Sequence, residues 1–287
     1  KTRHYYEQAA EADNVNAQNN LGVLHYHGQG VPQSYDEAKR WWLRAAEGGN
    51  AIAQNNLARF YFEGSGGAQS YTEARRWWQR AAEQGNVEAK LNLGTLYENG
   101  WGVARDDAEA KRWWEEAAGQ GDVEAQFNLG VLHENGEGVP QSYEQAFHWY
   151  ERAAEAGLAV AQHNVGDYYA RGRGVAQDWQ TARHYFELAA LANHPEAEFN
   201  LGLIAHRGLG QPRDDGAARR WWQQAAGQDL GRAQVALAGL LGRGLGGPRD
   251  RERAYHWLER AEAQAAQEED LWWRVKMMRW ALELLER

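Results

Sequence analysis

Histidines and paired carboxylates are the residues that could do chemistry in this chain of 287 residues. His25 and His27 are two positions apart, and on a helix this spacing points their rings in different directions rather than toward one metal ion. Adjacent acids such as Glu115 and Glu116 fit a helix surface, where negative charge is common near the start. The chain has no cysteine, and therefore no thiolate ligand, disulfide or cysteine nucleophile. We expect no metal site, no cofactor and no enzymatic activity.

A Gly-x-Gly pair is the other motif with a chemical reading. It occurs at Gly28 and Gly30 and returns at a fixed step as far as Gly244 and Gly246. A dinucleotide-binding loop needs a β-strand before its glycines, and here an apolar helical pattern precedes each pair. Neither H-E-x-x-H nor G-x-S-x-G is present. We interpret the pair as the end of a helix.

The step between these glycines is 36 residues, and an alanine column has the same period. The column comprises Ala17, Ala53, Ala89, Ala125, Ala161, Ala197 and Ala233. Self-similarity at such a period indicates a repeat architecture. The sequence therefore predicts a single solenoid domain over 14–265, made of seven full units that run from 14–49 to 230–265 without an insertion.

Each unit is expected to begin with a helix that has one apolar face, as Ala17, Leu21 and Leu24 show in the first unit. The capping position holds Asn14, Asn50, Asn86 and Asp122, and then Leu158, His194 and Leu230. Asparagine and aspartate are good N-caps, so the last three units have weaker ones. The position of Gly22 is always glycine or alanine, and we expect a backbone to approach closely there.

A second helix follows in each unit. Its N-cap column reads Ser34, Ser70, Asp106, Ser142, Asp178, Asp214 and Asp250. Glu37 lies three residues after Ser34 and is expected to complete a capping box. Two adjacent bulky residues, Trp41 and Trp42 in the first unit, recur through the repeats and account for most of the 15 tryptophans. Small alanines flank them, so we interpret the pairs as core that stacked neighbours bury together, rather than as carbohydrate-stacking sites.

The two ends depart from the full repeat. Residues 1–13 align with a second helix whose first helix is missing, so we expect further chain before Lys1. Residues 266–287 are expected to form a C-terminal capping helix, whose apolar stripe is Leu271, Val275, Met278, Leu282 and Leu285. A docking helix is the alternative, because Trp272, Trp273, Met277 and Trp280 add apolar surface around that stripe.

The unit resembles the Sel1-like repeat, a 36-residue relative of the tetratricopeptide repeat. The matching residues of the first unit are Ala17, Leu21, Gly22, Gly28, Gly30, Val31, Ala38, Trp41, Trp42, Ala45, Ala46 and Glu47. The resemblance covers the chain up to the C-terminal helix. Departures are mild: Gly67, Gln211 and Gly247 replace the loop valine. It implies an all-α, right-handed superhelix of about 16 helices, with first helices lining a concave face, and a non-enzymatic adaptor for other proteins.

The positions of Asn19, Val23 and Tyr26 are expected to face away from the core, and this outward side of the first helices is the predicted partner-binding surface. Its residues are Val23, Tyr26, His27, Arg59, Phe62, Glu63, Thr95, Glu98, Asn99, Glu134, Asn135, Asp167, Arg171, Leu203, His206, Arg207 and Arg243. Four of them, Glu63, Glu98, Glu134 and Asp167, form an acidic middle, and Arg171, Arg207 and Arg243 form a basic ladder. Opposite charges orient a partner and speed association. Tyr26 and Phe62, aromatic among polar neighbours, are the candidate anchors.

The partner is therefore expected to be another protein. A net charge of −9 argues against nucleic acid and against an anionic membrane surface, and no apolar run has the length of a membrane span. The resemblance includes periplasmic immunity proteins that neutralise secreted lipase effectors, which places the chain in the periplasm or cell envelope, with the cytoplasm as the alternative. A multi-partner adaptor in bacterial signalling or envelope assembly, and a glycan- or peptidoglycan-binding module, are the other readings.

Overall fold

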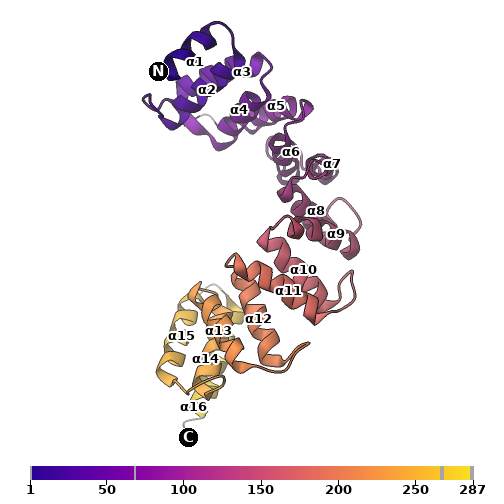
Figure 1. The fold of residues 1–287 in the computed structure, drawn as a ribbon, viewed down its shortest axis with the longest axis vertical. Coiled ribbons are helices and arrows are strands. Elements are labelled where there is room, and N and C mark those ends of the chain that lie inside the picture. Colours follow the sequence, from indigo (N-terminus) through magenta and orange to yellow (C-terminus); the bar gives the residue numbers. More distant parts are fainter. Residues whose placement is uncertain (1, 68, 266–267, 285–287) are drawn as a thin grey trace. The chain divides into compact units, whose positions relative to one another are not determined.

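The computed structural model describes residues 2–67, 69–265 and 268–284, and this part of the chain folds into sixteen α-helices and no strand. The chain divides into two compact units, residues 1–142 and 143–287. Figure 1 shows both as successive helix pairs. The all-α helical-repeat fold expected from the sequence is confirmed.

Unit 1 holds α1 to α8, and all but α1 have the same length. Their bounds are α1 Thr2–Glu11, α2 Val15–His27, α3 Tyr35–Glu47, α4 Ala51–Glu63, α5 Tyr71–Glu83, α6 Val87–Asn99, α7 Asp107–Gly119 and α8 Val123–Asn135. A short 3₁₀ turn, η1, spans Ser65–Gly67. The even-numbered helices are the first helices of the repeats, and α2 packs on α3, α4 on α5 and α6 on α7.

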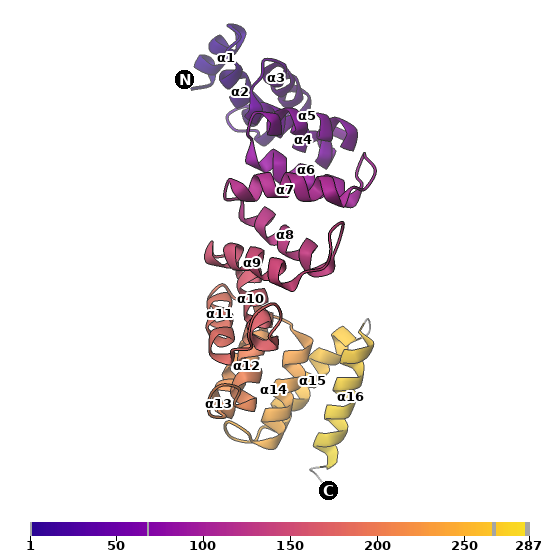
Figure 2. The same ribbon diagram turned by 90° about the vertical axis from the view of Figure 1, so that its right-hand side faces the viewer.

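Unit 2 holds α9 to α16. Their bounds are α9 Tyr143–Glu155, α10 Ala159–Arg171, α11 Trp179–Leu191, α12 Pro195–Arg207, α13 Asp215–Gly227, α14 Gly231–Arg243, α15 Arg251–Gln264 and α16 Glu269–Leu284. The last helix packs on both α14 and α15, and Figure 2 shows these three side by side. Leu271, Val275 and Leu282 of the predicted stripe are buried there, whereas Leu285 lies outside the described residues.

The helix starts and ends follow the predicted signals. Asn14 accepts a hydrogen bond from the Ala17 amide at 3.0 Å, and α2 ends at Gly28, whose φ of +67° is left-handed. Leu158 makes no side-chain cap, as expected. His194 does cap its helix, because its ring accepts from the Ala197 amide.

The capping box predicted for the second helices is only half present. The Ser34 hydroxyl accepts from the Glu37 amide at 3.3 Å, as expected. The reciprocal bond is missing because the Ser34 amide already donates to the His25 carbonyl at 2.9 Å. The Glu37 carboxylate instead pairs with Arg40 at 2.6 Å. The last turn of the first helix thus supplies the acceptor that the box would have supplied.

The small residue at the position of Gly22 is explained by an indole ring and not by a backbone, so that expectation was wrong. A Cβ atom on Gly22 would lie 2.4 Å from Trp42, and one on Gly94 would lie 2.3 Å from Trp114. These tryptophans are the second members of the aromatic pairs and are almost fully buried. The glycine and the large ring therefore fit each other within one repeat.

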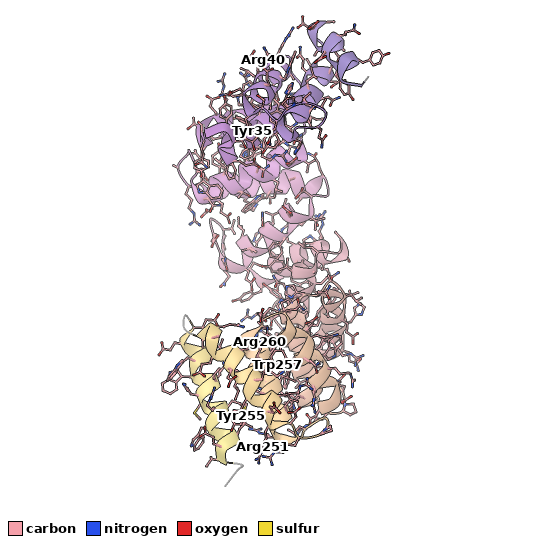
Figure 3. The ribbon with its side chains drawn as sticks, turned by 90° about the vertical axis from the view of Figure 1, so that its left-hand side faces the viewer. Tyr35, Arg40, Arg251, Tyr255, Trp257 and Arg260 are labelled. Atoms are coloured by element: carbon pink, nitrogen blue, oxygen red, sulfur yellow. The ribbon has the colours of Figure 1, made fainter. Side chains whose placement is uncertain are left out.

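The first members of the pairs lie closer to solvent, and arginines cover several of them. Arg112 lies 4.0 Å from the centroid of the Trp113 ring, and Arg260 lies 4.9 Å from that of Trp257. Figure 3 labels Trp257 and Arg260 on α15. Stacked guanidinium groups shield the ring faces that a sugar would need. This agrees with the interpretation of the pairs as structural.

A buried polar column connects successive repeats. Gln54 donates to the Ala46 carbonyl at 3.0 Å, and Gln18 donates to the Ala10 carbonyl at the same distance. The bond ties the first helix of one repeat to the second helix of the previous repeat. The neighbouring column is buried as well: Asn55 accepts from the Trp78 indole at 2.9 Å. We expected the side chains at that column to face away from the core, and at Asn19 and Asn55 they do not.

Candidate partner-binding surface

The predicted surface residues come from the first helices of both units. In unit 1 they lie on α2, α4, α6 and α8, and in unit 2 on α10, α12 and α14. Of the acidic middle, only Asp167 belongs to unit 2, whereas the basic ladder belongs to it entirely. The acidic residues therefore lie mostly in unit 1, and the basic residues lie in unit 2.

The candidate anchors Tyr26 and Phe62 are half-buried members of two equivalent aromatic clusters. The Tyr26 ring lies 5.4 Å from Tyr35 and 5.3 Å from Trp42. Phe62 has the corresponding partners in the next repeat, Tyr71 and Trp78, at 5.4 Å and 5.3 Å. Both rings thus hold the loop against the helices. They offer a partner an edge, and not a whole ring.

Carboxylates on the same side of unit 1 are mostly engaged. Glu63 accepts a hydrogen bond from the Tyr26 hydroxyl at 2.9 Å. Glu98 is half-buried, and this burial, together with the nearby Glu137 carboxylate, raises its pKa. Arg105 pairs with Asp107 at 2.8 Å and approaches Glu137 at 3.8 Å. One arginine therefore balances several carboxylates, and the surface around Glu98 is acidic.

In unit 2 the basic ladder is partly neutralised. Arg171 pairs with Asp167 on the same helix at 2.7 Å, so the last acid of the predicted middle cancels the first base of the ladder. Arg207 and Arg243 are exposed, and neither forms an ion pair with any residue in the described part of the chain. These two guanidinium groups carry the available positive charge.

His206 is held in a small network at the edge of the same surface. Its Nδ1 lies 2.6 Å from Asp215, which also pairs with Arg213 at 2.8 Å. The hydrogen bond from Arg213, with a smaller effect of His206, holds the pKa of Asp215 below its usual value. The carboxylate stays charged and fixes the imidazole beside the Trp222 ring.

A cleft of roughly 990 Å³ opens within unit 2. Four predicted residues line it: Arg171, Leu203, His206 and Arg207. Its other walls come mostly from α14 and α16, which contribute Arg232, Leu271 and Arg274, and four carboxylates also line it, those of Glu196, Asp229, Glu268 and Asp270. The sequence argument did not bring Arg232 or Arg274 to this surface, because it followed only the outward columns of the repeats and treated the C-terminal helix separately. In the described residues, no three histidines or acids are placed to bind one metal ion, and no helix is long and apolar enough to span a bilayer.

The Sel1 repeat model matches the chain over residues 1–14, 15–50, 51–86, 87–122, 123–158, 159–194, 195–230 and 231–265. The chain belongs to the Sel1 repeat family. Sel1 repeats serve as protein-interaction scaffolds. The match to residues 1–14 corresponds to the second helix of a repeat, which is the part played by α1.

Two solved structures resemble this Sel1 repeat protein closely. A Sel1 repeat protein from Oxalobacter formigenes is 33% identical, with a TM-score of 0.78 over 96% of this chain and 79% of that one. A protective antigen of uropathogenic Escherichia coli is 34% identical, with a TM-score of 0.87 over 91% of this chain. This chain spans only 56% of the antigen's length.

An immunity protein from Pseudomonas aeruginosa is much less similar, at 19% identity and a TM-score of 0.43 over 78% of this chain and 81% of that one. A likeness of this size supports no argument about function. Among curated proteins, no sequence matches this chain.

Proposed function

We propose that this Sel1 repeat protein is a non-enzymatic scaffold that binds one folded partner protein along the outward side of its first helices. The cleft of unit 2 is the observation that carries the proposal. It combines apolar side chains such as Leu203 with unpaired positive charge at Arg207. Apolar contact supplies affinity at an interface, and charge at its rim supplies orientation and rate.

The more specific form of this function is a periplasmic immunity protein that neutralises a secreted lipase effector. It rests on membership of the Sel1 repeat family, whose resemblance implies roles of this kind among others. Such a role needs one partner, held tightly and in fixed stoichiometry. A multi-partner adaptor would instead bind several proteins weakly, so the two forms differ in the number of partners recovered.

A glycan- or peptidoglycan-binding module is the second candidate, because three tryptophans of α16 are exposed. Trp272, Trp273 and Trp280 are 39%, 55% and 57% accessible. Exposed indole rings can stack on sugars as well as on protein side chains. Binding of purified peptidoglycan fragments, lost when Trp273 and Trp280 are changed to alanine, would favour this candidate.

Affinity capture from envelope and secreted fractions, followed by mass spectrometry, tests the main proposal. The first variant carries Glu63→Lys, Glu98→Lys and Glu134→Lys, and the second carries Arg207→Glu and Arg243→Glu. Arg220→Glu, on the exposed side of the second helix α13, is the matched control. We expect one stoichiometric protein that the control retains and that at least one of the two variants loses.

Two outcomes would contradict the proposal. In the first, the wild-type chain captures no protein whose binding can be reproduced by calorimetry with the purified components. Alternatively, both variants could retain the partner with unchanged affinity, which would move the contact to the second helices.

A further inference from the structure

The seventh repeat has no side chain at two outward positions. Gly239 and Gly242 occupy the columns of Val23 and Tyr26, and α16 lies directly on them. A Cβ atom would lie 2.8 Å from Met278 at Gly239 and 2.3 Å from Leu282 at Gly242. The two glycines therefore let α16 approach α14 closely. At these two positions, side chains of α16 take the place of side chains on α14.

The replacing helix is apolar on two sides. Leu271, Val275 and Leu282 are buried against the repeats. Trp273, Met277, Trp280 and Leu284 are exposed by 55%, 57%, 57% and 45%, and their spacing of four, three and four residues places them on one face. The terminal cap of a solenoid needs a polar outer face. This outer face is apolar instead, which is typical of a contact surface.

A hollow of roughly 400 Å³ lies where α12, α14 and α16 meet. Its apolar lining is Phe199, Val235, Ala236, Met277, Met278 and Ala281, and its polar lining is Arg232, Arg243 and Arg274. It shares Phe199, Arg232, Ala236 and Arg274 with the larger cleft. The two hollows therefore form one continuous groove, entirely within unit 2, with flexible Met277 at its edge.

Positive charge dominates the smaller hollow, which has three arginines and no carboxylate in its lining. Arg232 pairs with Glu196, and Arg274 pairs with Asp270 at 2.7 Å. Arg243 has no ion-pair partner among the described residues. Burial and the charge of Arg274 lower the pKa of Arg232, which shows that like charges are crowded here. A carboxylate from outside would relieve this repulsion and would pair with Arg243.

We propose that this groove binds an acidic segment of the partner protein, with one apolar side chain seated between Phe199 and Met277 and carboxylates on Arg243 and Arg207. This proposal rests on the protein-binding function and adds to it the location of the contact and the chemistry of the partner. An anionic membrane would also suit arginines beside tryptophans. The net charge of −9 on the chain opposes that reading, because a lipid surface meets the whole charge and a peptide meets only the groove.

Selection of random 12-residue peptides on the full chain tests the proposal, with counter-selection on a chain that carries both Arg243→Glu and Met277→Glu. Arg243 and Met277 are exposed, so neither change should disturb the fold. We expect the selected peptides to be rich in aspartate and glutamate around one large apolar residue. Fluorescence anisotropy should show binding at least about tenfold weaker for each single variant, and weaker binding in high salt. Arg220→Glu is the matched control and should change the affinity by less than about twofold.

Any of five outcomes would overturn the groove proposal. Selected peptides could be neutral or basic, or they could bind the two groove variants as tightly as the wild type. Vesicles of phosphatidylglycerol could bind the chain through Met277 while no peptide does so. The chain could also form dimers that Met277→Glu separates, which would make a second copy the occupant. The fifth outcome is a stoichiometric partner that is captured independently of Arg243 and Met277, which would contradict the groove proposal but not the protein-binding function. Failure to capture any partner would contradict the protein-binding function itself.

Discussion

The pairing of a glycine with a buried indole ring is the sharpest constraint at the scale of single residues. Trp114 donates to the Leu91 carbonyl at 3.2 Å, and this position needs the empty space above Gly94. Repeat two shows how alanine is tolerated. There Ala58 replaces the glycine, and Trp78 donates to the Asn55 side chain instead. Leu91 offers no such acceptor in repeat three.

Gly94→Ala is therefore expected to destabilise the chain by about 1–3 kcal/mol, because the added methyl group overpacks a filled core. Urea denaturation followed by circular dichroism measures the change. Gly119→Ala is the control: its Cβ would meet nothing within 4 Å, so it should be neutral or slightly stabilising. Adding Leu91→Asn to Gly94→Ala should restore part of the loss. Equal stability of the wild type and Gly94→Ala would refute the steric explanation.

His163 makes the folded chain sensitive to acid. Its ring stacks on His194 at 4.9 Å, and burial, with a smaller effect of His194, lowers its pKa to about 4. The usual value is about 6.5, so the unfolded chain takes up the proton first as pH falls. The stability that depends on neutral His163 is fully present above about pH 6.5. It declines as pH falls toward 4, by up to about 3 kcal/mol.

His163→Phe should remove most of this decline, because Phe127 and Phe199 occupy the same column in the neighbouring repeats. The measurement is the urea midpoint at pH 7, 6, 5 and 4 for both chains. The urea midpoints of the two chains should diverge between pH 6.5 and 4, because the midpoint of the variant should fall less. Parallel curves would assign the acid sensitivity to other groups.

At the scale of the helices, most of the architecture could be predicted, because each helix carries its own signals. Asn14 and Gly28 begin and end α2 through bonds to their own backbone, and these bonds depend on nothing distant. The capping box of Glu37 could not be judged this way. Its outcome depends on the His25 carbonyl, which reaches Ser34 only once the loop has folded. Local rules therefore predicted helix ends well and competition between bonds poorly.

The surface was harder to predict than the helices. Exposure had to be inferred from a single helical wheel, so the position of Asn55 was assigned to the outside, although Asn55 is buried and bonded to Trp78 and Glu88. The polar column of Gln54 was also overlooked, because glutamine looks like a surface residue until a carbonyl of the previous repeat is placed beside it. The role of Gly239 and Gly242 appears only when α16 is seen to rest on α14.

At the scale of the whole molecule, the division into two compact units falls at residue 142, inside the repeat match of 123–158, the fifth of eight. The 36-residue period gives no hint of it, since the columns pass through this point without interruption. The groove proposed for the acidic segment uses residues between Arg171 and Ala281 only. Recognition by this groove is therefore expected to be a property of unit 2.

A fragment of residues 159–287, which begins at α10 and keeps whole helix pairs, tests this independence. Stability in repeat proteins is close to a sum over neighbouring units, so the fragment should fold by itself, with a lower urea midpoint than the full chain. Circular dichroism should show a helical, cooperative transition. The selected acidic peptides should bind it within about threefold of their affinity for the full chain, because every arginine and apolar residue of the groove is retained. A folded fragment that binds more than about tenfold more weakly would show that residues before α10, in unit 1 or in α9, supply part of the contact. A fragment that does not fold would show that helices α10 to α16 need the preceding repeats for their stability.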